Sequence, residues 1–256
     1  MLRRAFRMLD PERALARMPK LEPVPGSAGW REYIVLGDRR AVIQRGDVML
    51  LTGQRVDEIS ELFAAAVTYF TRSVYYHAMV YDHAWRFWHA FQTRVFRADV
   101  PGFFFNETEV ALSWLRPGRR DGRPLTKADT ARVINFCRRQ NGKKYDLWAN
   151  AAFLFRADGM MWIPARIRPI LWRLFQDRNW LRNPNRWHCS ELAAAAWLVG
   201  AGVSFVDGMK QKVFVSPADI YDSIYTELVC TIKLSGGAFE LLTAAGATEG
   251  DSDSDG

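Results

Sequence analysis

The sequence predicts an α+β fold in which a central antiparallel β-sheet packs against a few helices. Short runs of β-branched and aromatic residues recur from residue 33 to residue 116 and again at 227–234, separated by turn residues. Helix-capping sequences stand at Thr126 and at Ser216. A run of small and apolar residues that begins at Cys189 predicts a further helix.

The composition is that of a globular protein. The chain has 256 residues, of which 49% are apolar and 25% are charged. Its three cysteines, Cys137, Cys189 and Cys230, are an odd number and widely separated, which argues against a disulfide framework and favours a reducing compartment. Neither a signal peptide nor an apolar stretch of membrane-spanning length is visible, so the cytoplasm is the expected location.

The charge is basic outside the C-terminal end. The net charge is +7, and because residues 249–256 carry −4, residues 1–248 carry +11. A basic body suggests an anionic partner, either nucleic acid or a lipid surface, although a charge excess that only aids solubility fits equally well. Zinc-finger spacing and RNA-binding aromatic signatures are missing, so nucleic acid is the weaker choice.

The chain divides into three parts. Residues 1–32 are basic and interrupted by four prolines, and they predict a short helix followed by an irregular arm. Residues 33–243 predict a single domain. Residues 244–256 are small and acidic, and they predict a disordered tail.

Strands are expected mainly in the first half of the domain. Residues 33–51 predict strands around a turn, and the Gly46-Asp47 pair opens the apolar run that follows. Residues 56–70 have helical apolar spacing. The remaining predicted strands are a three-stranded meander at 74–81, 85–91 and 93–100, and a further strand at 110–116.

Helices are expected mainly in the second half. One begins after Thr126 and ends near Asn141-Gly142. Residues 145–182 predict short helices broken by prolines. The helix from Cys189 to Val199 is stopped by glycines, a short helix follows Ser216, and residues 227–234 form the last expected strand.

Cys189 is the first candidate for chemistry. It is expected at a helix N-terminus, where free N–H groups lower the pKa of a thiol, and a histidine could act as its base. A metal ligand and a buried, inert thiol are the alternatives, and the inert thiol is the commoner case for a cysteine in this position.

Three histidines, His77, His83 and His89, are spaced six residues apart. A turn at Asp82-His83 would bring His77 and His89 onto neighbouring strands. Two imidazoles fall short of the three or four ligands that zinc requires, so neither a metal nor a cofactor is expected. A base oriented by a second polar group fits the pair better.

Five segments, in this order, resemble the circularly permuted branch of the NlpC/P60 papain-like superfamily, the YiiX/YebB-like cysteine hydrolases. They are RGDVMLL (45–51), SVYYHAMVY (73–81), NGKKYDLW (141–148), WHCSELAAAAW (187–197) and VSPADIYDS (215–223). The resemblance implies a permuted papain-like fold with the catalytic cysteine at a helix N-terminus. Papain-type enzymes run Cys before His, whereas here His77 precedes Cys189, as the permuted branch requires.

The resemblance also implies roles for single residues. Cys189 matches the nucleophile, His77 the base and His89 the third polar member, where many permuted members have Glu. Tyr145 is expected near the substrate.

Four further polar residues receive structural roles. Asp47 is expected to shape its turn, Glu191 to complement the helix dipole, His83 to lie in a turn and His188 to point away from Cys189.

The implied function is a cysteine-dependent hydrolase or acyltransferase that acts on an amide or ester bond of a peptide or lipid through a thioester. The alternative is a non-catalytic papain-like module that binds lipid or peptide at a membrane surface. Residues 160–182 mix Trp, Ile and Leu with Arg, which suits peripheral contact with a membrane. A core helix with a solvated Arg face explains the same segment.

Overall fold

The computed structural model describes a protein that is mostly sheet, with few helices, and thus an α+β fold. The described residues are 18–53, 73–91, 93–99, 109–146, 164, 166–167, 185–206, 215–235 and 238–243. The predicted helix at 56–70, almost all of 147–184 and the acidic tail lie outside them. None of the helices in these ranges is long and apolar enough to cross a membrane.

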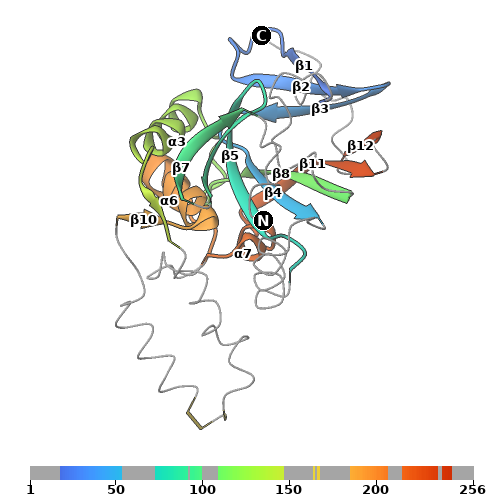
Figure 1. Cartoon of the computed structure of the whole chain (residues 1–256). Helices are drawn as coiled ribbons and strands as arrows, with labels where there is room; N and C mark the ends of the chain where they lie inside the picture. Colours follow the sequence, from blue (N-terminus) through green and yellow to red (C-terminus); the bar gives the residue numbers. More distant parts are fainter. Residues whose placement is uncertain are drawn as a thin grey trace.

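The strands of the described residues form two sheets (Figure 1). The smaller is antiparallel, with the order β1-β2-β3, and is formed by β1 (Lys20–Pro23), β2 (Arg31–Leu36) and β3 (Arg39–Gln44). The larger has nine strands in the order β10-β9-β7-β6-β5-β4-β8-β11-β12. Its strands are β4 (Val48–Gly53), β5 (His77–His83), β6 (Arg86–Phe91), β7 (Arg94–Asp99), β8 (Glu109–Pro117), β9 (Lys144–Tyr145), β10 (Arg186–Trp187), β11 (Thr226–Ser235) and β12 (Ala238–Thr243).

The predicted meander is confirmed, because β5, β6 and β7 pair antiparallel in sequence order. Two predictions need correction. Lys20–Pro23, placed in the irregular arm, is strand β1, so the small sheet begins before residue 33. Residues 227–234 are not the last strand, because β11 continues into β12.

Three helices are described: α3 (Lys127–Arg139), α6 (Cys189–Ala201) and α7 (Pro217–Tyr221). The capping boxes predicted at Thr126 and Ser216 are both present. Helix α6 does not stop at Gly200 but ends at Gly202, which caps it in a left-handed conformation at φ 69°. Eleven of the thirteen residues of α6 are buried, as expected for a helix that is apolar on all sides.

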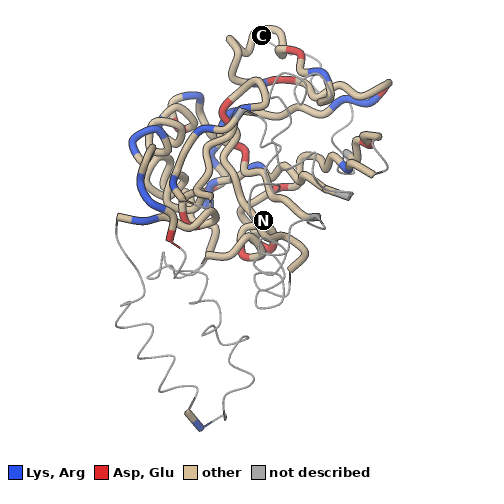
Figure 2. Tube along the Cα trace, viewed as in Figure 1, with Lys and Arg blue, Asp and Glu red and all other residues tan. Residues whose placement is uncertain are grey.

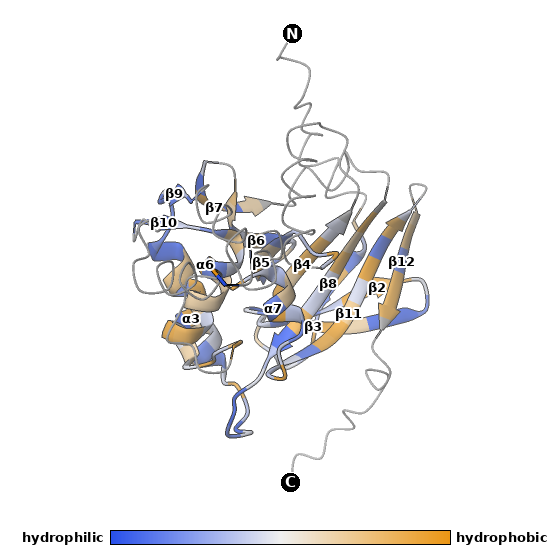
Figure 3. Cartoon of the chain, turned by 90° about the horizontal axis from the view of Figure 1, so that it is seen from below, coloured by the Kyte–Doolittle hydropathy of each residue, from blue (hydrophilic) through white to orange (hydrophobic). Residues whose placement is uncertain are grey.

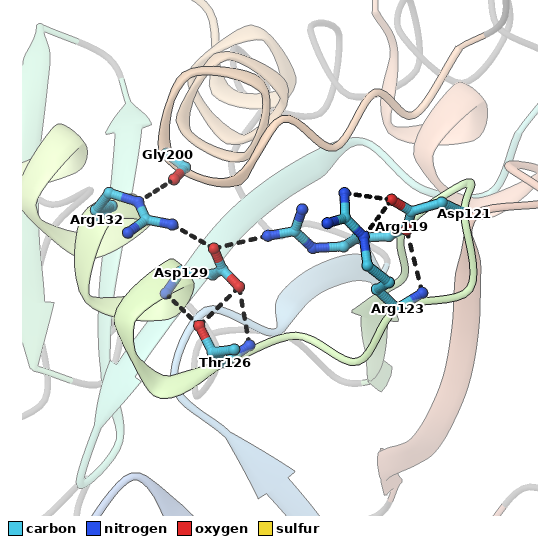
Figure 4. A network of polar contacts seen from close by, with 7 residues as sticks. All are labelled: Arg119, Asp121, Arg123, Thr126, Asp129, Arg132 and Gly200. Carbon is cyan, nitrogen blue, oxygen red and sulfur yellow. Dashed lines mark hydrogen bonds and ion pairs between the residues drawn. The ribbon is translucent and has the colours of Figure 1, made fainter.

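Helices α3 and α6 pack closely because Gly200 has no side chain. A Cβ atom at Gly200 would lie 2.7 Å from the backbone nitrogen of Val133. Arg132 Nε donates to the Gly200 carbonyl at 2.8 Å. Figure 4 shows this contact continuing through Asp129, which accepts hydrogen bonds from Arg119 and Thr126 at the start of α3.

The large sheet has a core on each face. One face packs against α3 and α6, through Val48, Leu50, Ala78 and Val80 among others. The other face packs against the small sheet, and Met49, Met79, Ile34 and Ile43 belong to this second core. Apolar residues accordingly run along β4, β8 and β11 in Figure 3.

Candidate functional site

Cys189 is the first residue of α6, as the sequence predicts. Three features hold the helix in place. Trp197 Nε1 donates to the Gly46 carbonyl at 2.9 Å. Gly46 has φ 90°, and a Cβ there would lie 3.0 Å from the Trp197 ring, so glycine is needed for this approach. Gly46 N–H donates to Tyr81 of β5, which ties the turn, the helix and the strand together.

Asp47 shapes its turn, as expected. Its carboxylate accepts the Gln44 N–H at 2.9 Å and the guanidinium of Arg116 at 3.1 Å. Glu191 completes the capping box of α6, because its carboxylate accepts the backbone N–H of His188 at 3.5 Å. Both residues thus contribute to positioning α6 and β4.

His77 and His89 are brought together. His77 Nε2 lies 3.0 Å from His89 Nδ1, and both side chains are buried. Burial lowers the pKa of His89 to about 3, so its ring is neutral near pH 7. Phe91 lies against both rings, with centroids at 5.3 Å from His77 and 5.8 Å from His89. The pair is therefore a buried imidazole contact across β5 and β6, in which the His89 ring is neutral.

The sulfur of Cys189 meets β5 at the residue after His77. Burial raises the pKa of Cys189 to about 11, and hydrogen bonds from the backbone N–H groups of Ala78 and Ser190 lower it only in part. The paired part of β5 and β6 begins at Val80–Trp88, two residues beyond Ala78. Cys189 thus lies beside the first residues of β5.

Cys189 and the histidine pair lie on opposite faces of β5, because side chains alternate along a strand. Ala78 belongs to the core beneath α6, whereas Met79 and the His77 partner Leu51 belong to the opposite core. Side chains alternate along a strand, so His77 is directed to the face of Met79. Cys189 and the histidine pair therefore approach the start of β5 from its two sides.

His188 corrects a prediction, because it does not point away from Cys189. The sulfur lies 3.7 Å from Nδ1 and 3.7 Å from Nε2 of the His188 ring. A nitrogen lone pair lies in the ring plane and points away from the other nitrogen. Equal distances place the sulfur over the ring face, so His188 contacts the thiol without being aligned to take its proton.

Ser190 fixes the state of His188. The Ser190 hydroxyl donates to the Val215 carbonyl at 2.6 Å, so its oxygen is left to accept from His188 Nδ1–H at 3.0 Å. Burial lowers the pKa of His188 to about 3, which leaves a neutral ring with its proton on Nδ1. Ser190 was not predicted, although it follows Cys189 directly in the Cys-Ser-Glu-Leu motif.

The ring centroid of Tyr145 lies 5.8 Å from that of His188. Its contact with substrate stays a prediction. His83 ends β5 beside a turn in which Ala84 and Trp85 have positive φ. Its Nδ1 lies 3.2 Å from the Asp82 carboxylate, so His83 pairs with Asp82 at this turn.

In the described ranges, no cluster of three or more His, Cys, Asp or Glu side chains suits a metal ion. Cys137, Cys189 and Cys230 are all free and buried.

No family model matches the chain, and no curated protein matches it. Among solved structures, the chain is similar to the crystal structure of the metalloprotein yiiX from Escherichia coli O157:H7. The two share 13% sequence identity and a TM-score of 0.43, over 73% of this chain and 96% of the other. That likeness is too distant to assign a role to any residue.

Proposed function

We propose that this protein is a cysteine-dependent hydrolase or acyltransferase with a permuted papain-like fold, acting on an amide or ester bond of a peptide or lipid. The observation that carries the proposal is the 3.0 Å contact between His77 and His89 beside the point where Cys189, at the start of α6, meets the Ala78 amide. A nucleophile, a base and a group that orients the base then lie at one end of β5.

The proton path follows from the nitrogen atoms. When His77 Nε2–H donates to His89 Nδ1, the Nδ1 atom of His77 is left unprotonated and can accept the Cys189 proton. Because Cys189 and His77 approach β5 from opposite faces, this transfer requires the first residues of β5 to turn the His77 ring toward the sulfur. The thiolate attacks the carbonyl carbon, and the leaving amine or alcohol takes the proton from His77. Water or another acceptor then cleaves the thioester.

Other residues assist in this scheme. In this scheme the Ala78 and Ser190 N–H groups, whose hydrogen bonds lower the pKa of Cys189, would donate to the oxyanion. Tyr145 would contact the substrate beside His188. The proposed setting is cytoplasmic, with peripheral membrane contact through 160–182, a segment mostly outside the described residues.

One observation favours a second function, a non-catalytic papain-like module that binds lipid or peptide. The Cys189 thiol is buried and its pKa is raised to about 11, so little thiolate exists at pH 7. Such a module would bind its ligand and form no thioester.

Hydrolysis of a panel of amide and ester probes separates the two functions. We expect Cys189→Ala to abolish turnover and His77→Gln to lower kcat about 100-fold or more, because a general base typically contributes about 10²–10⁴ in rate. Mass spectrometry should detect an acyl adduct on Cys189 in the wild type.

Matched controls are Cys137→Ala, a second buried thiol, and His83→Gln, a histidine in the turn; both should retain turnover. If Cys189→Ala turned over every probe at the wild-type rate, the hydrolase would be ruled out. Ligand binding that survives this substitution with no adduct in the wild type would establish the binding module instead.

A further inference from the structure

Exposed and half-buried basic side chains gather where the end of α3 meets β7, β9 and β10, and Figure 2 shows Lys and Arg along these elements. The backbone brings them together, because Gly142 N–H donates to Val95 and Val95 N–H donates to Lys143, both at 2.8 Å. We call this surface the basic face. Its members are Arg94, Arg138, Arg139, Lys143, Lys144 and Arg186.

Among the described residues, no acidic side chain forms an ion pair with the basic face. Residues 130–145 contain five Lys or Arg and no Asp or Glu. Asp146, which follows, is buried. The ion pairs of the described ranges involve other cations, such as Arg45 with Asp82.

The like charges paired across β7, β9 and β10 destabilise the fold. Arg94 is paired directly with Lys144 across β7 and β9, and Lys144 is paired directly with Arg186 across β9 and β10. Like charges at directly opposed positions of a sheet repel. Arg138 and Arg139 complement the dipole of α3. The dipole does not account for the three residues on strands, Arg94, Lys144 and Arg186. A bound anionic surface would offset their repulsion.

The sequence of residues 147–184 indicates which kind of anionic surface the basic face binds. Residues 147–184 leave from the end of β9 and return at β10, and Asp146 N–H donates to the Trp187 carbonyl at 3.0 Å between these points. Of these 38 residues 22 are apolar, four are Trp, and the net charge is +4. Apolar and Trp-rich sequence attached to a basic face matches a lipid bilayer interface, whereas nucleic acid offers no apolar phase.

We propose that the basic face docks on an anionic lipid membrane, with its Lys and Arg side chains against the lipid head groups. This interaction rests on the peripheral membrane contact of the proposed function, for which it names the docking surface and the lipid charge, and it does not depend on the proposed chemistry. The face borders the candidate site, because Cys189 lies two residues after Trp187 of β10.

Co-sedimentation of the full chain with vesicles tests the docking. We expect binding to phosphatidylcholine vesicles that contain about 30% phosphatidylserine, no binding to pure phosphatidylcholine, and release at high salt. Lys144→Glu should weaken binding about fivefold or more, and Arg139→Glu/Lys144→Glu should weaken it further. Lys144→Glu should also raise the Tm, because it converts two like-charge pairs into opposite-charge pairs.

The control is Arg40→Glu/Lys127→Glu, which changes the charge equally at exposed positions on β3 and at the first residue of α3. It should bind vesicles like the wild type. Three results would overturn the proposal. The control could lose as much vesicle binding as Arg139→Glu/Lys144→Glu, the wild type could bind neutral vesicles as well as anionic ones, or it could fail to sediment with anionic vesicles at low salt. A gel shift with nucleic acid that Arg139→Glu/Lys144→Glu abolishes while vesicles remain unbound would overturn it as well. None of these results bears on probe hydrolysis by Cys189.

Discussion

Cys189 is held as a protonated thiol by its surroundings. Burial raises its pKa to about 11, and the hydrogen bonds from Ala78 and Ser190 only partly oppose that effect. The dipole of α6, which the sequence suggests as an activating influence, is therefore outweighed by desolvation. Under the proposed mechanism, the thiol therefore loses its proton when the substrate binds, and it is not a thiolate beforehand.

The two buried neutral histidines make stability depend on pH. The folded-state pKa values of His89 and His188 lie near 3, well below the usual value of about 6.5. The unfolded chain therefore binds more protons, so this contribution is full above about pH 6.5 and is lost as the pH falls toward 3. We expect the free energy of unfolding to drop by up to about 1.4 kcal/mol per pH unit for each histidine.

Urea denaturation at pH 7.5, 6.0 and 5.0 measures this dependence, and His89→Gln/His188→Gln should show a weaker one. Substitution of His83, which lies in the turn, serves as the control and should leave the slope unchanged. A wild-type free energy of unfolding that stays constant from pH 7.5 to 5.0 would contradict the assignment of neutral buried rings.

At the scale of elements, the contact between α3 and α6 depends on a single missing side chain. The Cβ that alanine would add at Gly200 meets Val133 backbone atoms at 2.7 and 2.8 Å, and backbone cannot move aside as a flexible side chain can. The position of α6, and with it that of Cys189, follows from this packing.

Gly200→Ala is expected to destabilise the protein by about 1–3 kcal/mol, because overpacking outweighs the gain in helix propensity of about 1 kcal/mol. Thermal and urea unfolding measure the change. Val199→Ala, at an exposed neighbouring position of α6, should cost under about 1 kcal/mol. A Gly200→Ala protein as stable as the wild type would show that the two helices can separate freely.

The sequence predicted elements where a local signal is strong. The caps at Thr126 and Ser216 and the start of α6 at Cys189 were all found, because a cap is encoded within four residues. Strand β1 was missed because Lys20–Pro23 is short and ends in proline, and it becomes a strand only by pairing with β2.

Contacts between distant segments were predicted less well. The His77–His89 contact could be anticipated because a hairpin joins the two residues. The position of His188 could not, because it depends on Ser190 and on a carbonyl 27 residues away at Val215. No periodicity or propensity encodes such a contact.

At the scale of the whole molecule, an ion pair joins the two sheets. Asp47, before β4, accepts from Nε and Nη2 of Arg116 on β8, and Nη2 of Arg116 also donates to Val42 of the small sheet at 2.7 Å. Asp47 is fully buried. The pair thus couples the small sheet to the strands that carry the site.

Asp47→Asn should cost more than about 1 kcal/mol, because it leaves the half-buried Arg116 guanidinium without a counter-charge. Asp47→Asn/Arg116→Met should be more stable than the single variant, and urea denaturation of all three completes the cycle. Asp121→Asn, in an exposed pair with Arg123, should leave the stability close to that of the wild type. An equally small effect of Asp47→Asn would mean that the pair does not hold the sheets together.

The short parallel pair β9–β10 has a consequence for how this protein can change. Lys144–Tyr145 and Arg186–Trp187 lie side by side, so the sheet fixes both attachment points of residues 147–184. A segment whose two ends are already neighbours can be lengthened, shortened or exchanged without shifting the register of any other strand. Exchanging residues 147–184 for a segment of another length would therefore leave the register of the described strands unchanged.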